Sequence, residues 1–191
     1  MKRYILWTIL LLLSVGCGAT SSYFVIAQPT TTPKHHTKSL PTIGVEKISL
    51  PEYLQQSKVA IQLSPTQLSY KGGDTWAGDM ETSLTNELIS TIQRSFDHPY
   101  VYAYPWNLSK QAGIKVKVTI SRFIAYDSSV YLDANWEIYD LQTQKSNSRL
   151  FSITVATLSD TPSIVASMSK AFEKLSITII DEIAKSSRPS I

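Results

Sequence analysis

Strict alternation of apolar and polar residues over 114–155 constrains the fold of this chain more than any other feature. Every second residue is apolar in 114–120, 130–138 and 151–155, and polar turns at 127–129 and 142–147 separate these segments. A period of two is typical of strands that bury one face and leave the other in water. The sequence therefore predicts an antiparallel meander of three strands with one covered face.

Two other segments repeat their apolar residues at helical spacing. The first runs from Trp76 to Phe96 with Asp74 as its expected N-cap, and the second is capped by Thr161 and continues to Ile183. Shorter strands are expected at 23–27, 43–48, 59–63 and 67–70. Together these elements predict an α+β fold: a two-layer sandwich of a largely antiparallel sheet with two amphipathic helices packed on it.

The N-terminus has the pattern of a secretory signal. Lys2 and Arg3 precede an apolar run over 4–15, which is shorter than the roughly 20 residues that a membrane span needs. The run ends at Gly16 and Cys17, and Cys17 is the only cysteine of the chain. The segment 13–17 resembles the bacterial lipobox, in which the cysteine receives a diacylglycerol and an N-acyl chain such as palmitate. The alternatives are an incidental cysteine, a free thiol or an intermolecular disulfide.

These features divide the chain into three expected parts. They are a signal peptide over 1–16, a lipidated tether over 17–22 and a single periplasmic domain over 23–188. The five residues after Cys17 reach at most about 17 Å when extended, so the domain is expected close to the bilayer. Gly18, rather than an aspartate, follows the cysteine, and by resemblance to the enterobacterial sorting rule this indicates the periplasmic face of the outer membrane.

Catalytic patterns are weak in this sequence. The three histidines, His35, His36 and His98, have no carboxylate or thiol pattern of a metal site around them, and a solvated loop pair is expected for the first two. Asp133 and Glu137 share a strand face but lie roughly 13 Å apart. No serine has the context of a nucleophile. We expect neither an enzyme nor a metal or cofactor, and the 18 basic and 15 acidic residues do not indicate a nucleic-acid partner.

Two loops hold apolar and aromatic side chains, Leu50-Pro51-Glu52-Tyr53-Leu54 and Tyr104-Pro105-Trp106. Such residues either form a patch that binds a partner or fold back into the core. The sequence alone leaves both roles open.

Six short segments follow one another along the expected mature chain: Tyr23-Phe24-Val25, Ile43-Gly44-Val45, Leu50-Pro51-Glu52-Tyr53-Leu54, Asp74-Thr75-Trp76-Ala77, Tyr104-Pro105-Trp106 and Leu132-Asp133-Ala134-Asn135-Trp136. In this order they resemble the PqiC-like lipoproteins, also described as ABC-type transport auxiliary lipoproteins and associated with membrane integrity. The resemblance implies a non-enzymatic accessory subunit of an MCE/ABC-type envelope lipid transport system. Such a subunit would dock an MCE-domain periplasmic conduit at the outer membrane and could self-associate into a ring.

On this resemblance, a candidate partner interface is assigned to seven residues: Leu50, Pro51, Tyr53, Leu54, Tyr104, Pro105 and Trp106. Other classes of function remain open at this point. The first alternative is an assembly or pilotin-type lipoprotein of another envelope machine. An envelope hydrolase and a carrier that holds lipid in its own cavity are further alternatives.

Overall fold

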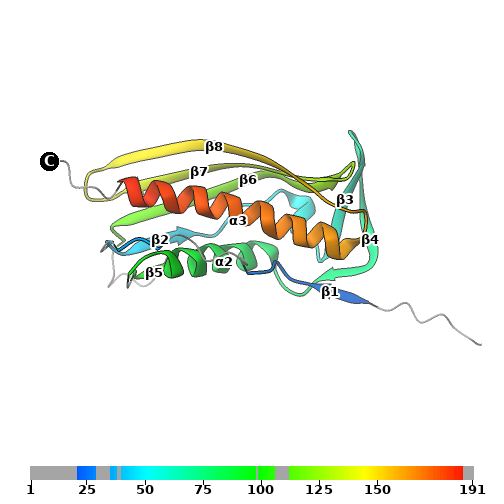
Figure 1. Ribbon diagram of the computed structural model, residues 1–191, viewed down its shortest axis with the longest axis horizontal. Helices are drawn as coiled ribbons and strands as arrows, with labels where there is room; N and C mark the ends of the chain where they lie inside the picture. Colours follow the sequence, from blue (N-terminus) through cyan, green and yellow to red (C-terminus); the bar gives the residue numbers. More distant parts are fainter. Residues whose placement is uncertain (1–20, 29–34, 38–39, 98, 106–111, 187–191) are drawn as a thin grey trace, which may run out of the picture.

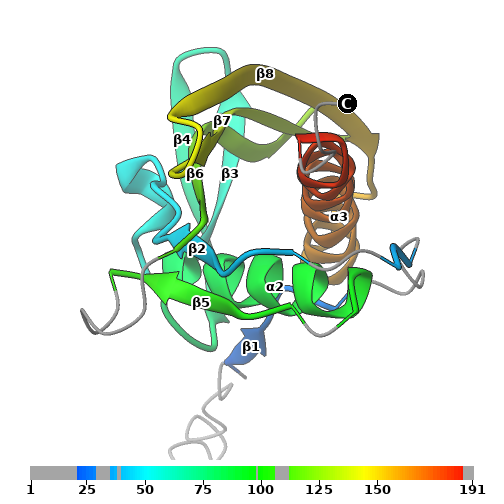
Figure 2. The ribbon, with the colours of Figure 1, turned by 90° about the vertical axis from the view of Figure 1, so that its left-hand side faces the viewer.

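A computed structural model describes residues 21–28, 35–37, 40–97, 99–105 and 112–186. Within these ranges one mixed sheet of eight strands carries two long helices on one face, as Figures 1 and 2 show. The predicted α+β sandwich is confirmed. Cys17, His98 and Trp106 lie outside the described residues. None of the helices in the described part has the length and apolar character that crossing a membrane requires.

The elements follow one another along the chain with these bounds: β1 (Ser22–Phe24), β2 (Ile43–Glu46), the 3-10 helix η1 (Glu52–Leu54), β3 (Lys58–Ser64), β4 (Gln67–Trp76), α2 (Met80–Ser95), β5 (Val101–Tyr104), β6 (Ile114–Tyr126), β7 (Ser129–Asp140), β8 (Lys145–Ala156) and α3 (Thr161–Ser186).

The predicted meander is formed by β6, β7 and β8, which pair antiparallel in chain order. The register places Val118 beside Trp136 and Leu132 beside Ile153, so the apolar residues of the three strands share one face. That face packs against α3, which contacts all three strands. The opposite face of the meander carries the polar residues of the alternation, and neither helix covers it (Figure 2).

The other edge of β6 is shared by two strands. β2 pairs parallel with the first residues of β6, and β3 pairs parallel with it at Ala125, near its end. β5 extends the sheet beyond β2, while β4 and then β1 extend it beyond β3. Only β6, β7 and β8, together with the β3–β4 hairpin, are antiparallel, so the sheet is more mixed than the sequence predicts.

The molecule has two distinct ends (Figure 1). One end, here called the tether end, contains β1, the β3–β4 hairpin, the loop 157–160 and the beginning of α3. The other, here called the distal end, contains β5, the turn between β7 and β8 and the end of α3. The 26 residues of α3 run between the two ends and span about 39 Å.

The predicted start of the first helix is wrong. β4 continues through Asp74 to Trp76 because β1 pairs with these residues and extends the ladder of backbone hydrogen bonds. Gly73, with a φ of 82°, lies at the register shift between β3 and β4, so the glycine pair makes an irregularity within β4 rather than the expected turn. α2 instead begins after Asp79, whose carboxylate accepts a hydrogen bond from the Thr82 N–H at 2.8 Å.

The cap of the second helix also differs from the prediction. Asp160 accepts a hydrogen bond from the Ser163 N–H at 2.9 Å, and its backbone carbonyl accepts one from Ile164 N–H. Thr161 is therefore inside the helix, where its hydroxyl donates to the Asp74 carboxylate. This hydrogen bond joins the beginning of α3 to β4 at the tether end.

Stability is expected to decrease in acid because three aspartates act as local caps. Hydrogen bonds from Thr82, from Thr143 and from Ser163 lower the pKa values of Asp79, Asp140 and Asp160 respectively. A lowered native pKa stabilises the fold above the unfolded pKa and loses this contribution as the pH falls through the native pKa. We predict that the free energy of unfolding in urea declines between about pH 5 and pH 2, and that D79N declines less steeply than wild type over this interval. Equal slopes for the two proteins would contradict the assignment.

Candidate interaction surface

The segment Leu50–Leu54 folds back into the protein. Leu54 is 1% exposed and Leu50 is buried with it in the core, whereas Glu52 is exposed and Pro51 and Tyr53 are half-buried. The two leucines therefore pack under η1 and hold it against the sheet. Of the candidate interface in this segment, only Pro51 and part of Tyr53 remain accessible to a partner.

Tyr53 completes the hydrogen bonding of β6. Its phenolic oxygen accepts a hydrogen bond from the Phe123 N–H at 2.9 Å. Phe123 follows a register shift in β6 and lies between the stretches that pair with β2 and with β3. A strand edge without a neighbour needs another acceptor for its buried N–H groups, and Tyr53 supplies one. Burial raises the pKa of the Tyr53 phenol, so it stays neutral at physiological pH.

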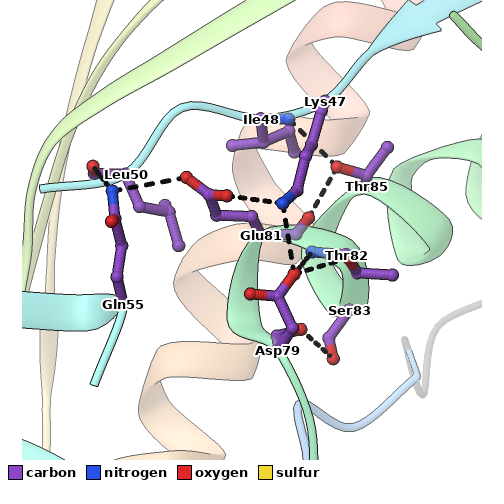
Figure 3. Close-up of polar contacts among 9 residues, drawn as sticks. All are labelled: Lys47, Ile48, Leu50, Gln55, Asp79, Glu81, Thr82, Ser83 and Thr85. Carbon is purple, nitrogen blue, oxygen red and sulfur yellow. Dashed lines mark hydrogen bonds and ion pairs between the residues drawn. The ribbon is translucent and has the colours of Figure 1, made fainter. Parts of the chain in front are cut away.

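A polar network fixes the same segment to the beginning of α2 (Figure 3). The Lys47 ammonium lies 2.7 Å from the Glu81 carboxylate and 3.5 Å from that of Asp79. Gln55 donates to the Leu50 carbonyl at 3.1 Å and also contacts Glu81. Ile48 N–H donates to the Thr85 hydroxyl, which itself donates to the Glu81 carbonyl. The backbone on both sides of η1 is thus held by α2, and we assign this segment a structural role.

Replacing Tyr53 by phenylalanine tests this structural role. The Phe123 N–H would lose its acceptor while remaining partly buried, so we expect Y53F to lower the free energy of unfolding by about 1–3 kcal/mol. Tyr100 is an exposed tyrosine that provides the control, and Y100F is expected to stay within about 0.5 kcal/mol of wild type in the same urea titration. Equal stabilities of Y53F and Y100F would contradict the role.

Tyr104 lies in a different environment at the distal end. It is the last residue of β5, pairs in register with Glu46 of β2 and is exposed. The Lys115 ammonium lies 3.0 Å from the Glu46 carboxylate and 5.5 Å from the centre of the Tyr104 ring. Hydrogen bonding to Glu46 raises the pKa of Lys115, which keeps the cation charged beside the ring. Pro105 continues the same exposed edge.

A shallow hollow of about 190 Å³ adjoins Tyr104 on the uncovered face of the sheet. It is lined by Glu46, Lys115, Lys117, Glu137 and Tyr139. We call these residues, together with Tyr104 and Pro105, the distal surface. It combines two tyrosines with charges of both signs, and tyrosines with such polar surroundings are common in protein–protein interfaces.

The structure does not join the two halves of the predicted interface. Lys115, beside Tyr104, and Phe123, beside Tyr53, are eight residues apart on β6, which corresponds to about 26 Å along the strand. The sequence shows the lining residues only as the polar positions of alternating strands. The antiparallel register of β6 and β7 brings the lining residues of these two strands together. Glu46 and Tyr104 join them only through the parallel pairing of β2 with β5 and β6, which no local pattern encodes.

The two described histidines have structural partners. His35 contacts the Asp97 carboxylate at 2.7 Å, and the His36 ring stacks on Phe96 with ring centres 5.1 Å apart. Asp133, considered above with Glu137, accepts a hydrogen bond from Ser152 on the neighbouring strand. Within the described ranges there is no group of three histidine, cysteine or carboxylate side chains that could hold a metal ion.

Comparison with known proteins gives a family match over most of the chain. The model of the ABC-type transport auxiliary lipoprotein component matches residues 24–180. No curated protein sequence matches the chain. The fold is similar to that of an uncharacterized protein in a crystal structure, with 20% identity and a TM-score of 0.69 over 86% of this chain and 99% of the other. It is also similar to protein XCC0632 from Xanthomonas campestris, with 16% identity and a TM-score of 0.71 over 86% and 95% of the two chains.

Proposed function

This chain belongs to the family of ABC-type transport auxiliary lipoprotein components, and from this premise we propose that it is an accessory subunit of an MCE/ABC-type envelope lipid transport system. In this proposal the protein is held at the periplasmic face of the outer membrane and docks an MCE-domain conduit. The observation that supports docking is the position of the distal surface, at the end of the domain opposite to the chain's entry at β1 (Figure 1).

Anchoring in this proposal depends on Cys17. A diacylglycerol and an N-acyl chain on its sulfur and amine would hold the domain by its tether end, because β1 begins only five residues later. The distal surface would then point into the periplasm, toward a protein that arrives from the inner membrane. The two ends of the domain would have separate tasks.

The features of the described residues support a docking role over the other classes. The hollow beside Tyr104 and a second one of about 170 Å³ at the tether end are both smaller than the usual 300–1,000 Å³ of small-molecule sites, so neither of these two hollows would enclose a whole lipid. A hydrolase would need a nucleophile hydrogen-bonded to an oriented base. The partners of His35 and His36 are instead a carboxylate and a phenyl ring.

Substitution of Tyr104 tests the docking role. We expect Y104A to reduce the amount of MCE-domain protein that co-purifies with the full-length protein from its own cells by more than tenfold, the effect of losing an interface residue worth about 2 kcal/mol. Y100A is the matched control, since Tyr100 is also exposed but lies just before the beginning of β5. Thermal unfolding of both variants checks that the fold is kept.

The same purification separates the proposal from its alternative. An assembly or pilotin-type lipoprotein could use the same anchor and the same distal surface. Recovery of a secretin or another assembly component, in place of an MCE-domain protein, would favour that function. Equal recovery of the MCE-domain protein with Y104A and with Y100A would show that the distal surface does not dock it.

A further inference from the structure

Exposed apolar side chains are concentrated at the tether end. Six of the ten large apolar residues that are exposed in the described part lie on or directly after β1, on the β3–β4 hairpin or in the loop after β8: Tyr23, Val25, Leu63, Leu68, Tyr70 and Leu158. Tyr23 is 71% exposed and Leu158 is 70% exposed. A group of this kind on one end of a domain indicates a surface that is covered in use.

Strand pairing and hydrogen bonds attach the segments that carry Tyr23 and Leu158 to the same strand, β4. β4 pairs with β1 at Asp74, and the Asp74 carboxylate accepts a hydrogen bond from Thr161 at the beginning of α3. Lys71 of the same strand donates to the Ser159 carbonyl at 3.0 Å, directly after Leu158. Both the strand that carries Tyr23 and the loop that carries Leu158 are therefore attached to one short stretch of β4.

Two lysines, Lys58 and Lys71, lie at the same end of the domain as these apolar residues. The register pairs Tyr23 with Thr75 and Thr75 with Lys58, so the tyrosine and the exposed lysine share one face of three adjacent strands. Lys71 lies beside Leu158 through its hydrogen bond to Ser159. Two of the carboxylates at this end, those of Asp74 and Asp160, accept hydrogen bonds from α3, while Asp127 is exposed in the turn after β6.

We propose that this end of the domain, through Tyr23, Val25 and Leu158 with Lys58 and Lys71 around them, rests in the headgroup region of the lipid bilayer. Tyrosine is enriched at the membrane–water interface, and a lysine can keep its stem in apolar surroundings while its ammonium reaches a phosphate. The inference rests on the anchoring at Cys17 proposed above. It adds a defined contact surface, and therefore a fixed orientation of the domain, to the lipid anchor.

The length of the tether favours the bilayer as the binding partner of this surface. Tyr23 follows Cys17 by six residues, so a lipid on Cys17 keeps the tether end within about 20 Å of the membrane at all times. The distal end lies about 39 Å further along α3 and cannot reach the bilayer while the domain stands on its tether end. Tyr23 on β1 is thus never further than about 20 Å from lipid.

The only native cysteine makes a direct test feasible. Once Cys17 carries lipid, the full-length protein has no free thiol, so L158C and V25C each provide a single site for an environment-sensitive fluorophore. L150C is the control, because Leu150 is 88% exposed in the middle of β8, away from the tether end. The labelled proteins are reconstituted in vesicles of phosphatidylethanolamine and phosphatidylglycerol, and quenching by a nitroxide-bearing lipid and by aqueous iodide is measured.

We expect the probes at 158 and 25 to be quenched severalfold more by the nitroxide lipid, and severalfold less by iodide, than the probe at 150. Equal iodide quenching at all three sites in protein that floats with the vesicles would overturn the contact and leave the anchor intact. If the probes at 158 and 25 are shielded from iodide but are not quenched by the nitroxide lipid, a protein and not the bilayer covers this end. That result would also overturn the membrane contact. If the wild-type protein does not float with the vesicles and its Cys17 reacts with the fluorophore, Cys17 carries no lipid. That result would overturn both the anchor and the membrane contact.

Discussion

Replacement of Cys17 by serine is expected to abolish acylation of the protein altogether. The diacylglycerol bond requires a sulfur atom, and the chain has no second cysteine to replace it. We expect wild type expressed in its own cells to incorporate labelled palmitate and to sediment with membranes, and C17S to incorporate none. A myristoyl-length chain alone binds membranes only weakly, so more than one chain on the same residue is needed for a stable anchor.

A matched control separates the position of the thiol from its presence. The double variant C17S/S22C restores one cysteine five residues later, at the start of β1. We expect it to remain without palmitate, because acylation depends on the residues before the cysteine. Label in C17S, or in the double variant to the wild-type level, would contradict the assignment of Cys17.

Replacement of Leu54 by alanine is expected to cause the largest loss of stability in the candidate interface. Leu54 is almost completely buried, and a leucine-to-alanine change in a packed core costs about 2–5 kcal/mol. Since a domain of this kind has a total stability of about 5–15 kcal/mol, L54A would unfold at a clearly lower urea concentration. Urea titration followed by circular dichroism measures the change.

Glu52, which is exposed in the same turn of η1, provides the control for Leu54. We expect E52A to stay within about 0.5 kcal/mol of wild type. If the segment docks a partner, E52A should weaken co-purification without changing stability, whereas L54A would weaken it only through unfolding. An L54A protein as stable as E52A would contradict the packing of this segment in the structure.

The parts of the fold that the sequence predicts well are those with long periodic patterns. The elements β6, β7, β8 and α3 each have at least 12 residues, and each contains a stretch in which the apolar residues recur with the period of its element. β4 is different because the irregularity around Gly73 interrupts its pattern and its last residues depend on pairing with β1. The four residues of β5 are too few to show a period, and the sequence therefore predicts a loop at Tyr104.

The candidate site is less predictable for the same physical reason. Leu50 and Leu54 are core residues supplied by a non-repetitive segment, where apolar character alone does not distinguish packing from binding. The acceptor role of Tyr53 depends on a gap between two strands that pair with β6 far apart in sequence. The distal surface likewise requires four strands to meet. The one local sign of the distal surface in the sequence is the position of Tyr104 beside a proline.

The most direct test of the account is site-specific photo-crosslinking in living cells at the two ends of the domain. A photoreactive phenylalanine derivative would replace Tyr104 at the distal surface in one full-length protein and Tyr23 on β1 in another. We expect a covalent product with an MCE-domain transport protein from position 104 and no such product from position 23. A product with that protein from position 23 alone, or a secretin from position 104, would contradict it.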